Sequence, residues 1–504
     1  MLLADVVATS AAVAATRSRT AKVAALADLL RRAADTGPDV VPIVTSYLAG
    51  ALRQRRTGLG WRSLQDLPDP ASDPALEVTE VDAAFERIAV LAGAGSQIAR
   101  ADATRQLFAR ATADEQRWLR GLVTGEVRQG ALDSLVQEGL AVAGGVSAAA
   151  VRRAAMMAGS TVDVATAALT DGEDALAAFV LEVGRPVLPM LASTAPTVEA
   201  AMAKAGGGDV AIDTKLDGIR IQVHRRGDDV LVVTRSLDDV TDRHPEVVTI
   251  ARGLPCHDVV LDGEVLALGP DGRPRPFQET ASRAATAGGT VRLTPAFFDL
   301  LHLDGQDHVD SPTAERLAAL ERVVPEQHRV PRLITADAGA AEEFAAQVLA
   351  LGHEGVVVKS LTSSYAAGRR GTSWVKVKPV HTLDLVVLAV ERGSGRRSGW
   401  LSNIHLGARD GDGFVMLGKT FKGMTDEILA WQTQRFRELE IDDNGYVVTV
   451  RPEQVVEIAF DGVQRSTRYP GGVALRFARV IRYRDDKSPA EADTIDTVRA
   501  FLPV

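Results

Sequence analysis

The spacing of apolar residues changes twice along the chain, and each change indicates a new kind of structure. Up to about residue 183, apolar side chains recur every three or four positions, as on one face of an α-helix. The segment from Lys22 to Arg32 shows this spacing. The pattern therefore predicts a helical domain over residues 1–183, interrupted by a loop at 66–77, where prolines fall among aspartates.

From residue 184 onward, short apolar runs typical of strands alternate with segments of helical spacing. The pattern predicts strands at 230–235, 259–268, 291–303 and 355–359, and a helix at 341–351. Because the runs are separated by helical segments, we expect an α+β domain over residues 184–380.

Beyond residue 380, short strands follow one another with glycine-rich turns between them. The pattern predicts strands at 383–390, 415–421, 446–450 and 455–460, with one helix near 424–440. A small β-barrel is the economical architecture for such a series, so we expect a barrel domain over residues 381–504.

Composition places this protein among ordinary cytosolic chains. Its 504 residues fit about three domains, and the formal net charge of −9 argues against a general polycation, so any nucleic-acid site must be local. The single cysteine, Cys256, excludes an internal disulfide and a cysteine-based metal site. No apolar run reaches the roughly 18 residues of a membrane helix. The N-terminus lacks an early positive charge and carries Asp5, which argues against a signal peptide.

Two segments of the helical region place arginines beside glycines, at 47–61 and 125–130. Glycine-containing turns and helix N-termini expose backbone N–H groups, and neighbouring arginines would help them bind a phosphate backbone. Ordinary connections between helices with solvated arginines fit these segments equally well.

The stretch from Asp213 to Arg220 carries the strongest candidate for chemistry. Residues 210–212 read as a buried strand, so Lys215 falls at a strand end, and Asp217-Gly218 supplies the turn that follows. An amine fixed at a strand end beside a carboxylate and an arginine suits a group that reacts with phosphate. A surface hairpin with an ordinary lysine is the alternative for this segment taken alone.

Further polar residues stand at the ends of later predicted strands. They are Arg235, Glu264, Phe298 (before Asp299), Glu354, Lys376 and Lys378. Side chains alternate along a strand, so Lys376 and Lys378 share one face while Val375 and Val377 face the core. Two lysines on one face repel unless an anion lies between them, which favours a phosphate site over a merely solvated face.

Taken together, these motifs identify a family: the chain resembles the ATP-dependent DNA ligases of the covalent nucleotidyltransferase superfamily. Lys215 to Arg220 matches the family's Lys-x-Asp-Gly-x-Arg motif, and the later strand-end residues follow in its order and spacing. Residues 476–487 resemble the family's last motif. The resemblance runs through nearly the whole chain and is nearest to three-domain ligases of actinobacteria.

The resemblance implies a multidomain fold. It comprises an all-α DNA-binding domain, an α+β nucleotidyltransferase domain of ATP-grasp-like ligase fold, and a β-barrel domain with an OB fold. Three departures from the family pattern remain: Ala478 stands where proline is usual, Asp213 where many relatives carry glutamate, and the segment 282–291 is short. The first concerns only a bend, and the contact at Asp213 is expected through the backbone. The third leaves a loop at the edge of the site undefined.

The resemblance also implies the first chemical step. Lys215 would attack the α-phosphorus of ATP, giving lysyl-AMP and pyrophosphate, and nearby cations would favour its uncharged form. Lys376, Lys378 and Mg²⁺ (or Mn²⁺) would stabilise the charge that gathers on the phosphate oxygens. Phe298 would stack on adenine, which Asp213 would also face. Glu264 would accept from the ribose or bind metal, and Glu354 is the main metal candidate.

The later steps would pass AMP to the 5′-phosphate of a DNA nick, where the 3′-hydroxyl displaces it. By resemblance, Arg220, Arg235 and Arg370 hold the nucleotide and nick phosphates. Arg370 is preferred to Arg369 because it keeps the family's spacing from Tyr365 and to Trp374. The cationic run of Arg476, Arg479, Arg482, Arg484 and Lys487 would meet the β- and γ-phosphates and then swing away.

Two other classes fit parts of this pattern. RNA ligases and RNA-capping enzymes share the lysine chemistry but do not generally carry a helical module ahead of it. A non-enzymatic DNA-binding scaffold would not need the intact set of lysines and glutamates. We therefore expect an ATP-dependent enzyme that seals nicks in double-stranded DNA, acts as a monomer, does not bind membranes, and is cytoplasmic and nucleoid-associated.

Overall fold

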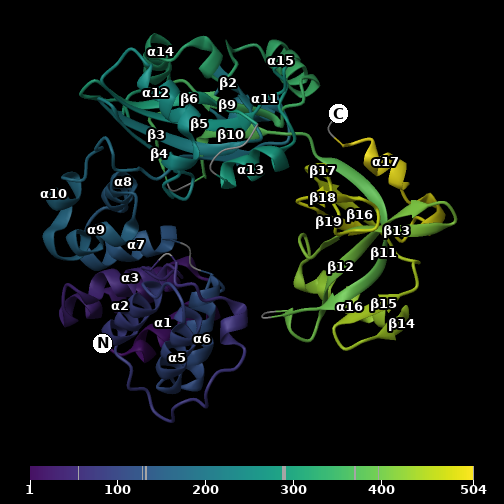
Figure 1. Ribbon diagram of the computed structural model, residues 1–504, viewed down its shortest axis with the longest axis horizontal. Coiled ribbons are helices and arrows are strands. Elements are labelled where there is room, and N and C mark those ends of the chain that lie inside the picture. Colours follow the sequence, from purple (N-terminus) through teal and green to yellow (C-terminus); the bar gives the residue numbers. More distant parts are fainter. Residues whose placement is uncertain are drawn as a thin grey trace.

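The computed structural model describes most of the chain (Figure 1). The described residues are 1–54, 56–127, 129–130, 133–286, 291–367, 370–394 and 397–502, with only the backbone described at Arg370. Several positions that the sequence analysis singled out therefore lie outside the description: Arg55, Arg128, Arg369, the side chain of Arg370, and residues 287–290 of the segment 282–291.

The elements before residue 183 are helices. They are α1 (Leu3–Ala15), α2 (Arg19–Thr36), α3 (Val40–Leu48), η1 (Trp61–Leu64), α4 (Val78–Ala89), α5 (Ser96–Ala109), α6 (Ala113–Thr124), α7 (Asp133–Gly144), α8 (Ala148–Ala158), α9 (Thr161–Thr166), η2 (Ala167–Asp171) and α10 (Gly172–Ala177). Their apolar faces meet in one core that includes Tyr47, Phe85 and Phe108. We call this part the helical domain.

Two antiparallel-rich sheets form the next part, here called the middle domain. One has the order β1-β10-β9-β2-β8, built from β1 (Leu191–Thr194), β2 (Val210–Lys215), β8 (Arg332–Thr335), β9 (Gly355–Ser360) and β10 (Arg370–Val377). The other has the order β4-β3-β5-β6-β7, built from β3 (Ile219–Arg226), β4 (Asp229–Thr234), β5 (Asp258–Ala267), β6 (Leu293–Leu303) and β7 (Gln306–Asp307).

Helices cover the outer faces of both sheets. They are α11 (Val198–Lys204), η3 (Thr241–Arg243), α12 (Pro245–Arg252), α13 (Phe277–Ala285), α14 (Thr313–Val323), η4 (Glu326–His328) and α15 (Ala338–Ala350). Val210 and Ile212 of β2 pack against Ala341 and Val348 of α15, so one end of β2 is anchored in a core. The other end, at Lys215, pairs with Gly355 of β9 and is half-buried.

The last part, the C-terminal domain, contains a larger sheet and a small hairpin. The seven-stranded sheet comprises β11 (His381–Arg392), β12 (Leu401–Asp410), β13 (Gly413–Thr420), β14 (Glu440–Asp443), β15 (Val447–Val450), β16 (Val455–Phe460) and β19 (Arg479–Tyr483). The hairpin is β17 (Gly462–Arg465) with β18 (Val473–Arg476), and the helices are α16 (Asp426–Glu438), η6 (Pro489–Glu491) and α17 (Ile495–Arg499).

Strand β11 organises this sheet because it pairs differently along its length. Its first half, from His381 to Val386, pairs with β16, and its second half pairs with β12 and β15. Sharing one strand among three partners in this way curves the sheet around an apolar core that contains Leu385, Val387 and Phe436.

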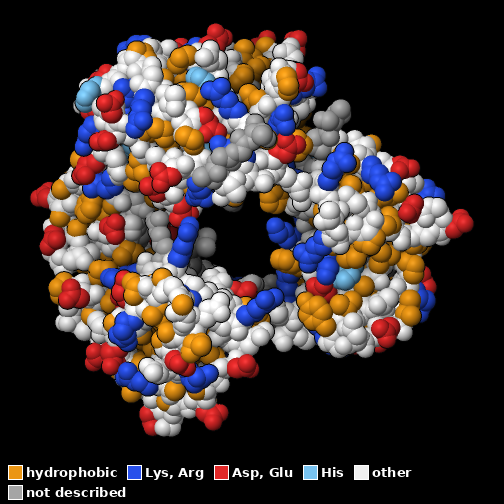
Figure 2. Space-filling model, viewed as in Figure 1, with side chains coloured by type: hydrophobic (Ala, Val, Ile, Leu, Met, Phe, Trp, Pro, Cys, Tyr) orange, Lys and Arg blue, Asp and Glu red, His pale blue; other side chains and the backbone are white. Residues whose placement is uncertain are grey.

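The three domains surround an opening, and lysine and arginine side chains lie on its rim (Figure 2). The helical domain joins the middle domain through an apolar cluster that includes Met156, Met157 and Tyr365, and through an ion pair of Arg153 with Asp310 at 2.6 Å. Among the described residues, no helix has the length and hydrophobicity needed to cross a membrane.

Candidate active site

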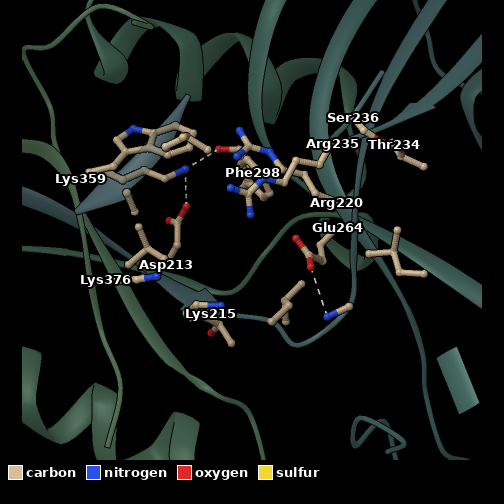
Figure 3. Close-up of a pocket in the computed structure, with 18 residues that line it drawn as sticks. Asp213, Lys215, Arg220, Thr234, Arg235, Ser236, Glu264, Phe298, Lys359 and Lys376 are labelled. Carbon is tan, nitrogen blue, oxygen red and sulfur yellow. Dashed lines mark hydrogen bonds and ion pairs between the residues drawn. The ribbon is translucent and has the colours of Figure 1, made fainter. Parts of the chain in front are cut away.

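A cavity of about 660 Å³ lies between the two sheets of the middle domain (Figure 3). Seven of the site residues expected from the sequence line it: Asp213, Lys215, Arg220, Arg235, Glu264, Phe298 and Lys376. Figure 3 shows Lys215 and Lys376 on one side of the cavity and Phe298, Arg220 and Arg235 on the other. These residues come from five strands and one turn, so the fold gathers distant parts of the sequence here.

Lys215 is held at the cavity by a carboxylate. Its side chain is 22% exposed and forms an ion pair with Glu354, whose other oxygen accepts from Lys378 at 2.9 Å. The pairing of β2 with β9 causes this contact, because it sets Lys215 opposite Gly355. Although burial opposes the effect, Lys215 and Lys378 lower the pKa of Glu354, which stays ionised between the two amines.

Lys378 lies just beyond the end of β10 and also meets the C-terminal domain. Its amine forms an ion pair with Asp461, which follows β16. Burial lowers the pKa of Lys378, but the hydrogen bonds to Asp461 and Glu354 outweigh burial and raise it. Lys378 is therefore a fixed positive charge beside Lys215, shared between two domains.

Glu264 projects from β5 beside the turn that follows Lys215. Its Oε1 accepts from the backbone N–H of Gly218 at 3.2 Å. A Cβ at position 218 would lie 2.4 Å from the carbonyl oxygen of Val265, so the close approach of this turn to β5 requires glycine. Burial raises the pKa of Glu264 to about 7, against the opposing effect of Lys215 and Arg220.

Phe298 and Trp374 form the aromatic part of the cavity. Their rings meet edge to face, with centroids 5.9 Å apart. Lys359 lies beside both rings, with its amine 4.3 Å from the Trp374 centroid and 4.7 Å from that of Phe298. Phe298 and Trp374 both line the cavity, so they give it an aromatic wall.

Asp213 is buried beneath this aromatic pair, with 2% of its surface exposed. It accepts from Arg332 at 3.0 Å and pairs with Lys359 at 2.7 Å. Burial works against ionisation here, yet the two cations lower the pKa of Asp213. Sequence reasoning missed Lys359 and Arg332 as site residues, although Lys359 ends a strand that it did predict, 355–359.

Arg220 faces the cavity from β3, over the rings of both Phe298 and Trp374. Its guanidinium carbon is 5.5 Å from one centroid and 5.7 Å from the other. Asp262 on the neighbouring strand accepts from its Nε at 3.0 Å and from its Nη2 at 2.6 Å. Arg220 and Asp262 therefore form a bidentate pair, with the Nε and Nη2 groups of the guanidinium directed at the carboxylate.

Arg235 follows the end of β4 in a turn with unusual backbone geometry. Leu237, two residues later, has φ +63°, and the hydroxyl of Ser236 donates to Asp238 at 2.6 Å. Gly159, which follows α8 in the helical domain, packs against this turn, since a Cβ at Gly159 would lie 3.2 Å from Leu237. The turn that carries Arg235 is thus supported by the helical domain.

The cationic residues near the C-terminus divide into two groups. Arg476 reaches the middle domain and pairs with Asp217, its Nη2 donating at 3.1 Å. Arg482 instead donates to Glu457 at 2.8 Å, and Lys487 to Asp384 at 2.5 Å, both within the C-terminal domain. In this arrangement Arg482 and Lys487 are not brought to the cavity.

The donor set suits a metal ion that is bound together with phosphate. No group of three or more His, Cys, Asp or Glu side chains that could hold a metal occurs in the described part of the chain. Mg²⁺ is commonly held by one or two carboxylates completed by water and substrate phosphates, and Glu354 and Glu264 offer such carboxylates beside Lys215.

Comparisons with known proteins cover all three parts of the chain. Models for the ATP-dependent DNA ligase domain, the C-terminal region of ATP-dependent DNA ligases and the DNA ligase N terminus match residues 189–378, 397–487 and 62–141. A protein named probable DNA ligase from Nocardioides sp. is 71% identical over 100% of this chain and 99% of its own length. Another of that name, from Kineococcus radiotolerans, is 66% identical over 99% of this chain and 100% of its own length.

The architecture agrees with these matches. The solved structure titled Pmar-Lig_PreS3 has a TM-score of 0.63 at 18% identity, covering 95% of this chain and 99% of that chain. The expected multidomain ligase architecture, with a nucleotidyltransferase domain and an OB-like C-terminal domain, is confirmed at that level. The resemblance that the motifs around Lys215 indicated is also confirmed: the chain belongs to the family of ATP-dependent DNA ligases.

Proposed function

We propose that this protein seals nicks in double-stranded DNA with ATP, through a lysyl-AMP formed on Lys215. The observation that carries this proposal is that Lys215 lines a cavity together with Phe298, Lys376 and Glu264, while Glu354 bridges Lys215 to Lys378. In that combination Lys215 is the nucleophile, Phe298 offers a contact for the adenine ring, and the other lysines offer positive charge to the phosphates.

In the first step, the amine of Lys215 forms a bond to the α-phosphorus of ATP, and the bond to pyrophosphate breaks. Phe298 stacks on adenine above the buried Asp213, and Lys376 and Lys378 neutralise phosphate charge. Glu354, with Glu264, is the ligand set for Mg²⁺ or Mn²⁺, which supplies further charge neutralisation when bound. The contact of Glu354 with Lys215 must loosen before the amine can attack.

In the second and third steps, AMP passes to the 5′-phosphate at the nick, and the 3′-hydroxyl then displaces AMP to form the phosphodiester bond. Arg220, Arg235 and Arg370 are the proposed contacts for these phosphates. Arg482 and Lys487 are assigned to the β- and γ-phosphates of ATP. Because they pair within the C-terminal domain here, that assignment requires the domain to turn before ATP reacts.

The domain assignments belong to the same proposal. Residues 1–183 form the DNA-binding domain, 184–380 the adenylation domain and 381–504 the OB-fold barrel, and the duplex passes through the opening that they surround (Figure 2). Basic side chains on the rim suit the charge of a phosphate backbone. We propose a monomer that works on the nucleoid in the cytoplasm, because chromosomal DNA is its substrate.

An RNA ligase or an RNA-capping enzyme is not favoured. The helical domain is matched over residues 62–141 by the DNA ligase N terminus, and close relatives named probable DNA ligase span the whole chain. Offering the enzyme nicked duplex DNA and nicked duplex RNA checks this choice. Faster sealing of RNA would overturn it.

The lysine chemistry is tested by incubating the protein with α-labelled ATP and a divalent metal. We expect covalent labelling that is lost in Lys215→Ala and kept in Lys204→Ala, a matched substitution of an exposed lysine on α11. Labelling that survives Lys215→Ala, or that is equally strong with GTP, would contradict the proposal.

A further inference from the structure

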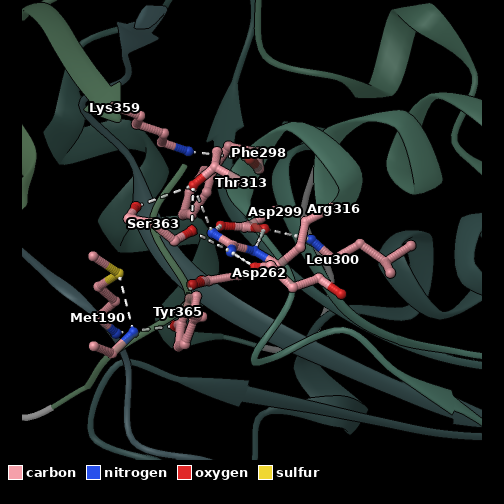
Figure 4. A network of polar contacts seen from close by, with 12 residues as sticks. Met190, Asp262, Phe298, Asp299, Leu300, Thr313, Arg316, Lys359, Ser363 and Tyr365 are labelled. Carbon is pink, nitrogen blue, oxygen red and sulfur yellow. Dashed lines mark hydrogen bonds and ion pairs between the residues drawn. The ribbon is translucent and has the colours of Figure 1, made fainter. Parts of the chain in front are cut away.

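Tyr365 is a buried side chain that connects several parts of the active site. It is 2% exposed and follows β9, in the loop that leads toward β10. Figure 4 shows its hydroxyl between Met190 and Asp262. Sequence reasoning used Tyr365 only as a spacing marker for Arg370, so the position carries no role so far.

The hydroxyl of Tyr365 uses both of its hydrogen-bonding capacities. It accepts from the backbone N–H of Met190 at 2.9 Å and donates to Oδ2 of Asp262 at 2.7 Å. Burial, followed by the charge of Asp262, raises the pKa of Tyr365 well above its usual value, so the hydroxyl keeps its proton and remains a donor.

Asp262 transmits this contact to Arg220. The same Oδ2 that Tyr365 bonds accepts from Nη2 of Arg220 at 2.6 Å, and Nη1 of Arg220 donates to the carbonyl oxygen of Met190 at 2.6 Å. Tyr365 thus hydrogen-bonds both residues that hold the guanidinium, namely Met190 and Asp262. Among the described residues, the hydrogen bonds of Arg220 go only to Asp262, Met190 and, at 3.4 Å, the hydroxyl of Tyr365.

The loop around Tyr365 is itself held rigidly. Its backbone N–H donates to Val309 at 2.9 Å, and the carbonyl oxygen of Ser363 accepts from Arg316 at 3.0 Å. Arg316 is fully buried against Asp299 (Figure 4). These bonds fix the place of Tyr365, so its hydroxyl is a reference point from which Asp262 and Arg220 take their orientation.

The ring of Tyr365 also reaches the aromatic part of the cavity. It meets Trp374 edge to face at 5.8 Å, and Trp374 in turn meets Phe298. The guanidinium of Arg220 lies over both of these rings, so one tyrosine contacts the aromatic group beside Arg220 through its ring and the hydrogen-bond partners of Arg220 through its hydroxyl. A phenylalanine at this position would keep the ring contact and lose only the hydroxyl.

We propose that Tyr365 is a positioning residue for ligation, whose hydroxyl, acting through Asp262, orients the guanidinium of Arg220 toward the phosphate that is being transferred. This inference rests on the proposed function, in which Arg220 contacts that phosphate. A tyrosine that served only the stability of the fold would act independently of Arg220. The two roles are therefore separated by whether the effects of changing Tyr365 and Arg220 are additive.

The test is a double-mutant cycle on single-turnover sealing of nicked DNA by adenylated enzyme at saturating enzyme concentration. We expect Tyr365→Phe to slow sealing by about 10-fold when Arg220 is present and by less than about 2-fold in the Arg220→Lys background. Binding of the nicked duplex should stay within about 2-fold of the unaltered protein, because the change concerns orientation.

Tyr483→Phe is the matched control. It removes a part-buried hydroxyl that hydrogen-bonds Gln432 in the C-terminal domain, away from the cavity, and should leave the sealing rate unchanged. Asp262→Asn tests the same inference independently, because it weakens the hydrogen bonds that orient Arg220. It should slow sealing when Arg220 is present and have little effect in the Arg220→Lys background. Equal slowing by Tyr365→Phe in both backgrounds, or no slowing in either, would overturn the inference.

Failure of the proposed function would look different. If the unaltered protein forms no lysyl-AMP or seals no DNA, the function itself is wrong. If the unaltered protein seals nicks and the two substitutions are additive, only the role of Tyr365 is wrong. Thermal unfolding of Tyr365→Phe and Tyr483→Phe, compared with the unaltered protein, shows how much stability each hydroxyl contributes.

Discussion

His224, on β3, fastens the segment that leads from the helical domain into the middle domain. Its Nδ1 accepts from the backbone N–H of Gly184 at 3.1 Å, so the proton of the neutral ring lies on Nε2, which donates to Gln222 at 2.8 Å. The side chain is 1% exposed. Burial, with a smaller effect of His302, lowers the pKa of His224 to about 3.

This ring makes the folded protein sensitive to mild acid. Between pH 6.5 and pH 3 the unfolded chain binds a proton at His224 that the folded chain does not, so stability is full above this window and falls as the pH drops through it. We expect His224 to remove roughly 2 kcal/mol of stability between about pH 7.5 and pH 5. The measurement is the urea unfolding midpoint at the two pH values.

The check uses His224→Asn, whose amide can accept from Gly184 and donate to Gln222 but does not titrate. The variant should lose less stability than the unaltered protein over the same pH interval. Identical losses in the two proteins would show that other groups carry the acid sensitivity.

Single residues differ in how far the sequence predicts their place. Lys215, Glu264 and Phe298 each lie on a strand that the apolar pattern predicts, and all three line the cavity. Their catalytic roles stay predictions. Arg332 lies on no predicted strand, and Lys359 lies on one that carried no hint of a site. The importance of both comes from Asp213, which is more than a hundred positions away along the chain and adjacent only in the folded sheet.

Helix α14 is attached to β6 by an ion pair that is shielded from water. Arg316 and Asp299 are both 0% exposed, and Arg316 also donates to Ser311 and Ser363. Removing one member of such a pair leaves the other charge buried without compensation, which costs about 3–5 kcal/mol. We therefore expect Arg316→Met to lower the urea unfolding midpoint strongly.

Removing both charges is the informative comparison. Asp299→Asn combined with Arg316→Met should recover most of the lost stability, because no uncompensated charge remains. If the double variant were as unstable as Arg316→Met, packing and hydrogen bonds around α14 would be responsible, and not the charge of Asp299.

At the scale of elements, strongly patterned segments were predicted well and irregular ones were not. The predicted helix at 341–351 corresponds to α15 (Ala338–Ala350), and the predicted strand at 455–460 to β16 (Val455–Phe460). Strand β12 (Leu401–Asp410) was missed, because Ser402, Asn403 and Gly407 dilute its apolar residues. Arg235, predicted to end a strand, lies just beyond β4.

At the scale of the whole molecule, two ion pairs between described residues connect the middle domain to the C-terminal domain. Arg476 pairs with Asp217, and Lys378 pairs with Asp461. Part-buried hydrogen bonds between charged groups contribute about 1.5–3 kcal/mol each. We expect Arg476→Met to shift the protein toward a more open arrangement, with a larger radius of gyration in small-angle X-ray scattering.

Arg482→Met is the control for this experiment, since Arg482 pairs with Glu457 inside the C-terminal domain and should leave the overall dimensions unchanged. The same radius of gyration for Arg476→Met and the unaltered protein would mean that this ion pair does not hold the domains together.

The sequence indicated separate domains because the periodicity changes near residues 184 and 381, and these boundaries stay predictions. It gave no information on how the domains are placed around the opening. That placement depends on contacts such as Arg153 with Asp310 and Arg476 with Asp217, between residues that no local pattern relates.

The joint between the last two domains lies beside a reactive lysine. Strand β10 ends at Val377 and β11 begins at His381, with the exposed Val380 between them. Lys378 therefore stands on the near side of the joint and Asp461 on the far side. A rotation of the C-terminal domain about this joint would remove Asp461 from Lys378, while Glu354 would still hold the amine beside Lys215. The position of the C-terminal domain would thus decide whether the positive charge of Lys378 is neutralised by Asp461 or is available to a nucleotide.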